Sequence, residues 1–499
     1  MTFIGKSTMC WLEFPRGCGF RTSLCLPSLS IDLEPCEMVL SMISATMRVE
    51  KSSPSVGRAG DSMDTAESSA EYKQFVIIGT AYALHDEDEP TKGRVMVLSC
   101  KPDEEGHPSK RSIKSFTELQ VRGGVYSMCQ FYDGRILITV NSKTQMCQLV
   151  DDGTGAVKLL TMGVGHHGHI LSLFVSSRAT KTMSLSPSAV SGTISNSESG
   201  ESKEKEGTEA KEQLAVVGDL MRSISLVQYY PEHKTLEEVA RDFNANWTTA
   251  VCMLTDDIYL GGENWNNLYV LRRNTKATNE EVRCRLDTVG EFHLGEMVNK
   301  FMSGSLVMPN SSEAASTASA GASRSRRRAL ASPKKAEGGK VPASPRSSNA
   351  ATTRSKRPVV SIGSQTLFGT TDGTLGSILG LDGPTTAFFA CLERSMQKSI
   401  KPVGNFSHQR FRAFNSDQRQ HPSHGFVDGD LVESFLDLDK ATMQKVVKEM
   451  NRDGGWEADD QAFANGAAGN KDESMVEETR PELAVEDVLA VVEEMTMLH

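Results

Sequence analysis

The chain has 499 residues, of which 38% are hydrophobic and 24% charged, so it is long enough for two or three domains of ordinary globular composition. It has no uninterrupted apolar run of about 18 residues or more, and we therefore expect no membrane span. The formal net charge of -10 argues against general nucleic-acid binding unless a basic patch is segregated from the acidic surface.

The N-terminal segment 1–35 has an uncertain role. A secretory signal peptide is disfavoured because Glu13, Pro15 and Arg16 interrupt its apolar run. Cysteines beyond this segment are scattered without a C-x-x-C pair. This pattern indicates reduced thiols of the nucleus or cytoplasm, with neither a disulfide framework nor a zinc site.

Residues 36–380 consist mainly of short apolar runs separated by Gly, Asp and Asn, which is typical of strands. Arg135–Val140 and Gln145–Val150 flank a polar turn and predict an antiparallel hairpin. No helical segment intervenes that could serve as a parallel crossover. The last predicted strands include Leu306–Met308. The sequence therefore predicts a mainly β domain, most simply built from the blades of a propeller.

Three stretches lack the apolar residues needed to offset the entropy of ordering, and we predict disordered loops at 51–69, 177–213 and 310–358. Within the last, the basic loop 324–357 carries eleven Lys or Arg against one acid, Glu337. It is interpreted as a nuclear import signal, a phosphate-binding arm or a solvated insertion. Its candidate nucleic-acid-binding residues are Arg326, Arg327, Arg328, Lys334, Lys335, Lys356 and Arg357.

The apolar period becomes helical after residue 380, so 381–499 is predicted to form a small helical domain. Asp439 is suited to cap one of its helices. A polar, acidic loop is expected at Asn451–Glu478. The predicted helices cover Thr385–Ile400, Asp430–Leu438, Ala441–Met450 and Pro481–Leu498.

Two motifs imitate functional sites. Gly163–Gly168 reads G-x-G-x-x-G, but the strand-like run Ile170–Val175 follows where a dinucleotide site needs a helix. His166, His167 and His169 have no acid or cysteine close by in sequence to complete a metal site, and a polar hairpin loop is the preferred interpretation. Asp428–Glu433 departs from the calcium-loop pattern and is better explained as a helix-initiating turn. With no catalytic signature elsewhere, we predict no enzyme activity, no cofactor and no metal.

Trp247 and Arg222 are candidate binding residues. Trp247 lies among turn residues, which leaves a surface position at a propeller rim and a core position both open. Arg222 begins an otherwise apolar strand, where it is either paired internally with Asp219 or Asp242 or offered to a partner.

Several segments between Glu34 and the C-terminus have an order and spacing that persist outside the loops. They are Val76–Ala81, Glu89–Arg94, Val125–Met128, Val217–Ser223, Ala240–Asn244, Gly262–Asn264, Phe292–Glu296, Gly304–Met308, Leu367–Thr370, Gly425–Leu436 and Val491–Thr496. These segments resemble the family of large three-propeller proteins shared by damage-specific DNA-binding proteins and the large subunit of the cleavage and polyadenylation factor. The resemblance is strongest to the DNA-repair adaptor branch.

The resemblance implies the third propeller of such a protein: a seven-bladed-type β-propeller, complete or incomplete, followed by a small α-helical C-terminal domain. In that family the first and third propellers hold WD-repeat substrate receptors of a cullin-RING ubiquitin ligase, while the second binds the cullin. The implied role is a non-catalytic scaffold in nucleotide-excision repair and protein ubiquitination, in the nucleus and also the cytoplasm. The alternative is a DNA- or RNA-binding protein of the same family that acts through the basic loop 324–357.

The resemblance also implies which residues contact a receptor. They are Tyr126, Leu171, Leu173, Phe174, Leu220, Arg222, Trp247, Ala250, Asn264 and Asn299. Three positions depart from the family pattern: Met297 replaces a Phe, Thr371 an aliphatic residue and Gly124 an alanine. Two propellers are not encoded, which leaves a truncated gene model, a fragment, or a split subunit whose other propellers come from another chain as alternatives.

Overall fold

The computed structural model describes residues 2–7, 33–51, 71–102, 111–151, 156–178, 212–306, 360, 362–454 and 482–497. The chain forms two compact units. The first comprises Met1–Ser303, Thr366–Ile378 and Pro402–Phe426, and the second Gly304–Gln365, Leu379–Lys401 and Val427–His499. All of the predicted disordered loop 310–358, with the basic loop 324–357, lies outside the described residues, as do most of 51–69, 177–213, segment 1–35 and the predicted acidic loop Asn451–Glu478. At the edges of two of these loops, Lys51 belongs to β2 and Gln213 to β11, so the predicted disorder is wrong there.

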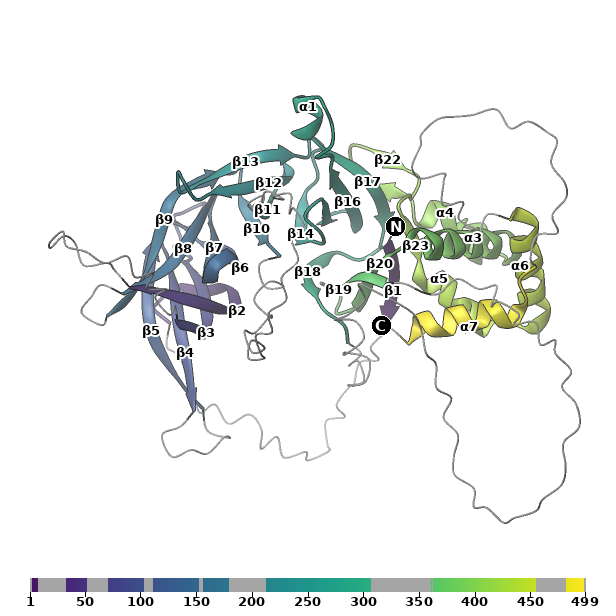
Figure 1. The fold of residues 1–499 in the computed structure, drawn as a ribbon, viewed down its shortest axis with the longest axis horizontal. Coiled ribbons are helices and arrows are strands. Elements are labelled where there is room, and N and C mark those ends of the chain that lie inside the picture. The colour runs from purple at the N-terminus through teal and green to yellow at the C-terminus, as the bar shows by residue number, and fades with distance from the viewer. Residues whose placement is uncertain are drawn as a thin grey trace, which may run out of the picture. The chain divides into compact units, whose positions relative to one another are not determined.

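Antiparallel meanders of consecutive strands build the first unit (Figure 1). The strands of the first two are β2 (Glu37–Lys51), β3 (Glu71–Tyr82), β4 (Gly93–Pro102) and β5 (Arg111–Val121), then β6 (Val125–Phe131), β7 (Arg135–Val140), β8 (Lys143–Asp151) and β9 (Val157–His167). The next two contain β10 (Ser172–Ser176), β11 (Gln213–Asp219), β12 (Ser223–Tyr230) and β13 (Thr235–Arg241), then β14 (Thr248–Met253), β15 (Ile258–Glu263), β16 (Asn267–Arg273) and β17 (Leu286–His293).

A further sheet has the order β18-β19-β20-β1-β23. Its strands are β18 (Val298–Ser303), β19 (Ile362–Thr370), β20 (Leu375–Leu381), β1 (Thr2–Ser7) and β23 (Phe426–Asp428). Of the strand predicted at Leu306–Met308, the structure describes only Leu306. Strand β18 ends at Ser303 and Leu306 is not in a strand, so the prediction is wrong at this residue.

The first strands of successive meanders pack against one another: β6 against β2 and β10, and β14 against β10 and β18. Strands thus pair in chain order within each of the four meanders, and each meander packs on the next, as the blades of a propeller do. Short parallel contacts join neighbouring meanders at Val49–Leu149 and at Thr235–Val164. The mainly β architecture predicted from the apolar runs is confirmed.

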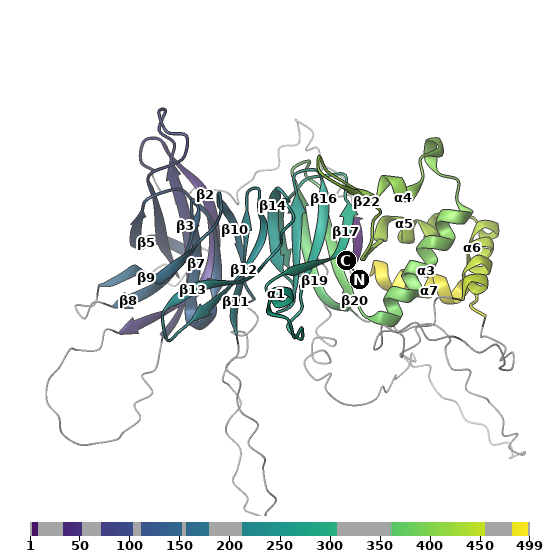
Figure 2. The ribbon, with the colours of Figure 1, turned by 90° about the horizontal axis from the view of Figure 1, so that it is seen from above.

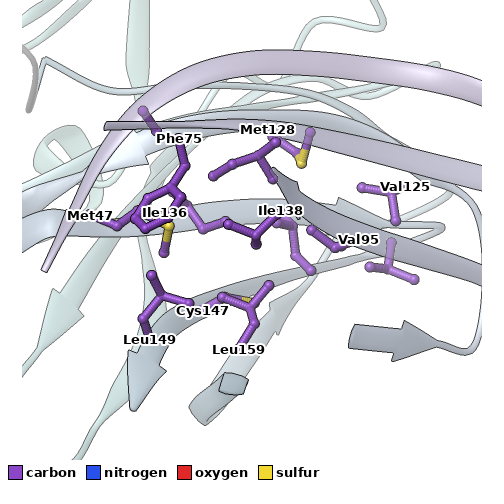
Figure 3. Close-up of a cluster of buried hydrophobic side chains, with 14 residues drawn as sticks. Met47, Phe75, Val95, Val125, Met128, Ile136, Ile138, Cys147, Leu149 and Leu159 are labelled. Atoms are coloured by element: carbon purple, nitrogen blue, oxygen red, sulfur yellow. The ribbon is translucent and has the colours of Figure 1, made fainter. Parts of the chain in front are cut away.

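Hydrophobic side chains fill the space between the stacked sheets. Figure 3 shows one such cluster, in which Phe75, Ile136 and Cys147 come from β3, β7 and β8. These side chains are buried because alternate residues of a strand point to the same face of its sheet. Burial raises the pKa of the Cys147 thiol to about 12, which keeps it protonated and inert.

Helices form the core of the second unit (Figure 2). These are α3 (Gly383–Ser399), α5 (Gly429–Glu433), α6 (Lys440–Asp453) and α7 (Val485–Thr496), with a 3-10 helix at Ser434–Asp437. Helix α3 packs against α5 and α6, and α7 against α6. The Asp439 carboxylate accepts hydrogen bonds from the amides of Ala441 and Thr442, which confirms it as the N-cap of α6.

The helix boundaries differ from the prediction. Helix α3 begins at Gly383, before the predicted Thr385, and α6 extends beyond the predicted Met450 to Asp453. Asp430–Leu438 divides into α5 and the 3-10 helix. Helix α7 begins at Val485 and not at Pro481, because Leu483 exchanges hydrogen bonds of 2.9 and 3.0 Å with the Asn451 side chain. Next to this anchor to α6, the backbone of Ala484 is extended.

The motifs that imitate functional sites have structural explanations. Gly163–Gly168 runs along β9 and beyond its end, and the next element is strand β10, as predicted. His166 and His167 are part of β9 and not of a hairpin loop. Asp428 is the N-cap of α5, which confirms the helix-initiating turn. Within the described ranges, no group of His, Cys, Asp or Glu side chains is arranged to hold a metal. No helix in the described part of the chain is long and apolar enough to span a membrane.

Candidate partner-binding surface

One end of the first unit gathers most of the predicted binding residues, and we call it the rim: residues 124–126, 141–142, 168–174, 219–223, 242–248, 264–266 and 299. Backbone hydrogen bonds join most of its segments, some within a meander and some between neighbouring meanders. They are Asn141 N to Gly124 O (3.2 Å), Ser172 N to Asn141 O (2.9 Å), Leu220 N to Leu171 O (2.9 Å), Ser223 N to Asn246 O (3.1 Å) and Asn264 N to Trp247 O (2.9 Å). The rim segments from residue 124 to residue 264 are therefore held together by backbone hydrogen bonds.

Trp247 is on the surface of the rim, with 41% of its area exposed, which decides between the two positions left open by the sequence. The Trp247 carbonyl oxygen accepts a hydrogen bond from Asn264 N, and Asn264 directly precedes the exposed Trp265. Phe243 is 67% exposed at the start of the same turn. Large exposed aromatic side chains are the anchors expected of a protein-binding hot spot.

Arg222 is exposed, and within the described chain its guanidinium does not pair with Asp219 or Asp242. Asp219 is buried and accepts hydrogen bonds from four backbone amides, at His169, Ile170, Met221 and Arg222. The Asp219 carboxylate therefore fixes the backbone at residues 169–170 and at residues 221–222, and the Arg222 side chain projects outward.

Asp242 organises the neighbouring turn. Its buried carboxylate accepts from Ser223 Oγ at 2.7 Å and from Asn246 Nδ2 at 3.2 Å, while Asn244 N binds its second oxygen at 3.1 Å. Burial raises the pKa of Asp242, and the hydrogen bond from Ser223 opposes that rise. Ser223 has a φ of 61°, an unfavourable conformation that this network holds in place.

The other predicted binding residues differ in exposure. Asn264 and Asn299 are exposed, and Tyr126, Leu171, Leu173, Phe174 and Leu220 are half-buried. Burial raises the pKa of the Tyr126 hydroxyl, and the charge of Glu89 adds to this rise. Ala250 is only 2% exposed and belongs to the core cluster with Leu260 and Leu268, so its methyl group is not part of the rim surface.

The positions that depart from the family pattern lie near the rim. Gly124 is buried where a methyl group would approach Ala81 Cβ to 3.1 Å, so an alanine fits only if its neighbours shift. Thr371 is exposed and donates its amide to Met297 O at 3.0 Å.

Phe243 and Trp265 were not identified from the sequence as binding residues. The signal available for Trp265 is its position in the turn Glu263–Asn267, where Asn266 has a φ of 64° and donates its amide to Glu263 O. An aromatic residue in such a turn cannot follow the alternation of a strand and is often exposed. The basic-loop residues Arg326, Arg327, Arg328, Lys334, Lys335, Lys356 and Arg357 lie outside the described residues.

Comparison with known proteins identifies relatives over most of the chain. The chain is 36% identical to DNA damage-binding protein 1a and 35% identical to DNA damage-binding protein 1b of Arabidopsis thaliana, in each case over 76% of the chain and 27% of the relative. It is 34% identical to DNA damage-binding protein 1 of Oryza sativa subsp. japonica, over 75% of the chain and 26% of that protein. The chain thus spans about a quarter of the length of these relatives.

The family model described as the CPSF A subunit region matches residues 25–177 and 207–437. This match includes every predicted rim residue. The resemblance inferred from the sequence motifs is confirmed, and the chain belongs to the CPSF A subunit region family.

Proposed function

We propose that this chain is a non-catalytic scaffold whose rim docks WD-repeat substrate receptors of a cullin-RING ubiquitin ligase in DNA-damage recognition, nucleotide-excision repair and protein ubiquitination. The observation that carries the proposal is the exposure of Trp247 and Arg222 on a hydrogen-bonded base. An aromatic residue and an arginine presented this way suit a rigid protein surface better than a small ligand. The names of the relatives support a role in DNA damage.

We also propose an architecture and a location for the complex. The first unit acts as a seven-bladed-type propeller, and two further propellers, encoded upstream or supplied by another chain, complete the receptor cleft and bind the cullin. The complex works in the nucleus and also in the cytoplasm. The stacked meanders and the share of the relatives that the chain covers support this arrangement.

A pull-down of WD-repeat receptors tests the proposal, with the full chain as bait. Trp247→Ala and Arg222→Glu are each expected to reduce capture at least about thirtyfold, the loss typical of a hot-spot residue. Tyr72→Ala is the matched control, because Tyr72 is an exposed aromatic at the first residues of β3, away from the rim. Capture that both rim variants leave unchanged would show that receptors do not dock here.

A second candidate function is nucleic-acid binding through the basic loop 324–357. It is favoured by the segregation of eleven Lys or Arg residues in a chain whose net charge is -10. Deletion of 324–357 is then expected to abolish retention of DNA and RNA and its dependence on salt. Retention that persists after the deletion would assign the binding elsewhere.

A further inference from the structure

A segment distant in sequence supports the part of the rim that carries Trp247. Residues 402–426 belong to the first unit and include α4 (His408–Phe411), β21 (Phe414–Asn415) and β22 (Gln420–His421). They follow the outer strand β17, where His293 N donates to Arg412 O at 3.0 Å and Glu291 N to His424 O at 2.8 Å. Asn267 Nδ2 adds a bond of 2.9 Å to Asn415 O. The segment is thus fastened along one side of the β14–β17 sheet.

Arg419 reaches from this segment to the base of the rim. It closes the turn between β21 and β22, where Ser416 N donates to Arg419 O at 3.0 Å. Its Nη1 lies 2.9 Å from Glu291 Oε1, and its Nη2 donates to Asn246 Oδ1 at 2.7 Å. The guanidinium also stacks on the Phe414 ring, 4.6 Å from the ring centre. Because Glu291, Asn246 and the Phe414 ring all contact the guanidinium, these three residues hold it in a single position.

Asn246 connects Arg419 to turn 242–247, which carries Phe243 and Trp247. Its side chain is buried, with the amide oxygen bound by Arg419 and the amide nitrogen bound to Ser223 Oγ and Asp242 Oδ2 at 3.3 and 3.2 Å. Its backbone oxygen accepts from Ser223 N. Asn246 directly precedes Trp247, and Asp242 directly precedes Phe243. Both aromatic residues therefore project from backbone that the Arg419 network holds.

The positive charge of Arg419 also stabilises the ionised form of buried carboxylates close to it. Asp242, Glu263 and Glu291 are buried carboxylates that interact with the charge of Arg419. Burial raises the pKa of Asp242 and of Glu263, and the positive charge of Arg419 opposes the rise in both. Removing that charge would leave buried acids with less compensation, which is costly in a medium of low polarity.

We propose that Arg419 is a positioning residue for the rim: by binding Asn246 and Glu291 together it fixes turn 242–247, so that segment 402–426 sets the partner affinity of a surface formed by other residues. The expected effect on partner affinity rests on the proposed receptor-docking function, but the effect of Arg419 on the position of Trp247 can be measured without a partner.

The first experiment uses the full chain labelled with 5-fluorotryptophan and observed by ¹⁹F NMR, with the Trp247 signal assigned by Trp247→Phe. Arg419→Gln is expected to shift or broaden the Trp247 signal, whereas Arg419→Lys, which keeps the charge, has a smaller effect. Arg410→Gln is the matched control, because Arg410 lies in the same segment but stacks on Phe406. A Trp247 signal that is the same in the wild type and in folded Arg419→Gln and Arg419→Lys overturns the inference.

The second experiment measures the affinity of a purified WD-repeat substrate receptor. Arg419→Gln is expected to weaken binding about tenfold in the wild type and less than about twofold in a Trp247→Phe background. The two substitutions are not additive if Arg419 acts on binding through the Trp247 side chain. Equal losses in both backgrounds would mean that Arg419 does not act through Trp247. If the Trp247 signal responds to Arg419→Gln but no receptor binds the wild type, the proposed function fails while the positioning role stands.

Discussion

Arg94 binds both carboxylate oxygens of Glu37, with Nε 2.6 Å from Oε1 and Nη2 2.8 Å from Oε2. The pair links β4 to β2 across the intervening strand β3. Its side chains are 9% and 0% exposed, and Thr80 Oγ1 donates a further bond of 2.7 Å to Glu37. A bidentate pair of this geometry is a strong and directional contact.

Replacing Arg94 with alanine should destabilise the first unit by about 3 kcal/mol, because Glu37 would remain buried without its counter-ion. This is the lower end for a buried pair, since Glu37 would keep its hydrogen bonds from Thr80 Oγ1 and from Glu34 N, of 2.7 and 2.8 Å. Urea denaturation measures the change. Lys92→Ala is the control, because its pair with Glu34 is exposed and should contribute little. Equal destabilisation by both variants would contradict this ranking.

The stability of the first unit should fall in acid through Glu37. Burial would raise the pKa of this carboxyl, but hydrogen bonds from Arg94 and Thr80 outweigh it and lower the pKa below the ordinary 4.5. The folded state therefore releases this proton more readily than the unfolded state, so the contribution is present above pH 4.5 and lost as pH falls through the lowered pKa. In thermal melts from about pH 3 to 7, Glu37→Gln should flatten the acid decline of the wild type. Parallel profiles would exclude Glu37 as a source of the acid sensitivity.

Gly261→Ala should destabilise the fold by about 1–3 kcal/mol, the range for overpacking a core. Gly261 pairs across strands with Tyr269, and a methyl group at this position would overlap the Tyr269 ring. Movement of that ring would also disturb the 3.2 Å bond between its hydroxyl and Thr248 Oγ1. Gly369→Ala, where the nearest atom would be 3.7 Å away, is the matched control. Denaturation that shows both variants equally stable would contradict the close packing at Gly261.

Removing the N-cap of α3 should weaken the helical unit. Asp382 Oδ1 accepts from Thr385 N at 3.0 Å, and loss of such a cap costs about 1 kcal/mol. Asp382→Ala should therefore accelerate amide hydrogen exchange in the first turn of α3, and Asp382→Asn, which preserves the acceptor, should not. Identical exchange in the two variants would show that the cap contributes nothing.

The aromatic residues that sequence analysis missed should contribute to binding. Trp265→Ala and Phe243→Ala are each expected to weaken a WD-repeat receptor about tenfold, because both side chains are exposed beside the Trp247 turn. Their melting temperatures should change little, since neither residue is in the core. Biolayer interferometry with the purified receptor measures the affinity. Wild-type affinity in both variants would restrict the docking surface to the residues around Trp247 and Arg222.

Local patterns in the sequence determined the elements and their class. Apolar alternation located strands such as β7 and β8, and the acid at Asp439 located the start of α6, because both signals depend on residues close in the chain. The motifs determined the family for the same reason: their order and spacing are properties of the chain itself. The start of α7 was not accessible in this way, because it depends on the contact between Leu483 and the distant Asn451.

Burial and partnership were decided only by the tertiary structure. Trp247 and Ala250 are three positions apart, yet one is exposed and the other is in the core, because stacking of neighbouring sheets covers only one of them. Arg222 could not be assigned from sequence, since its orientation depends on the amides that Asp219 binds. The contact between Arg419 and Asn246 joins residues 173 positions apart, and no periodic pattern encodes a contact of that range.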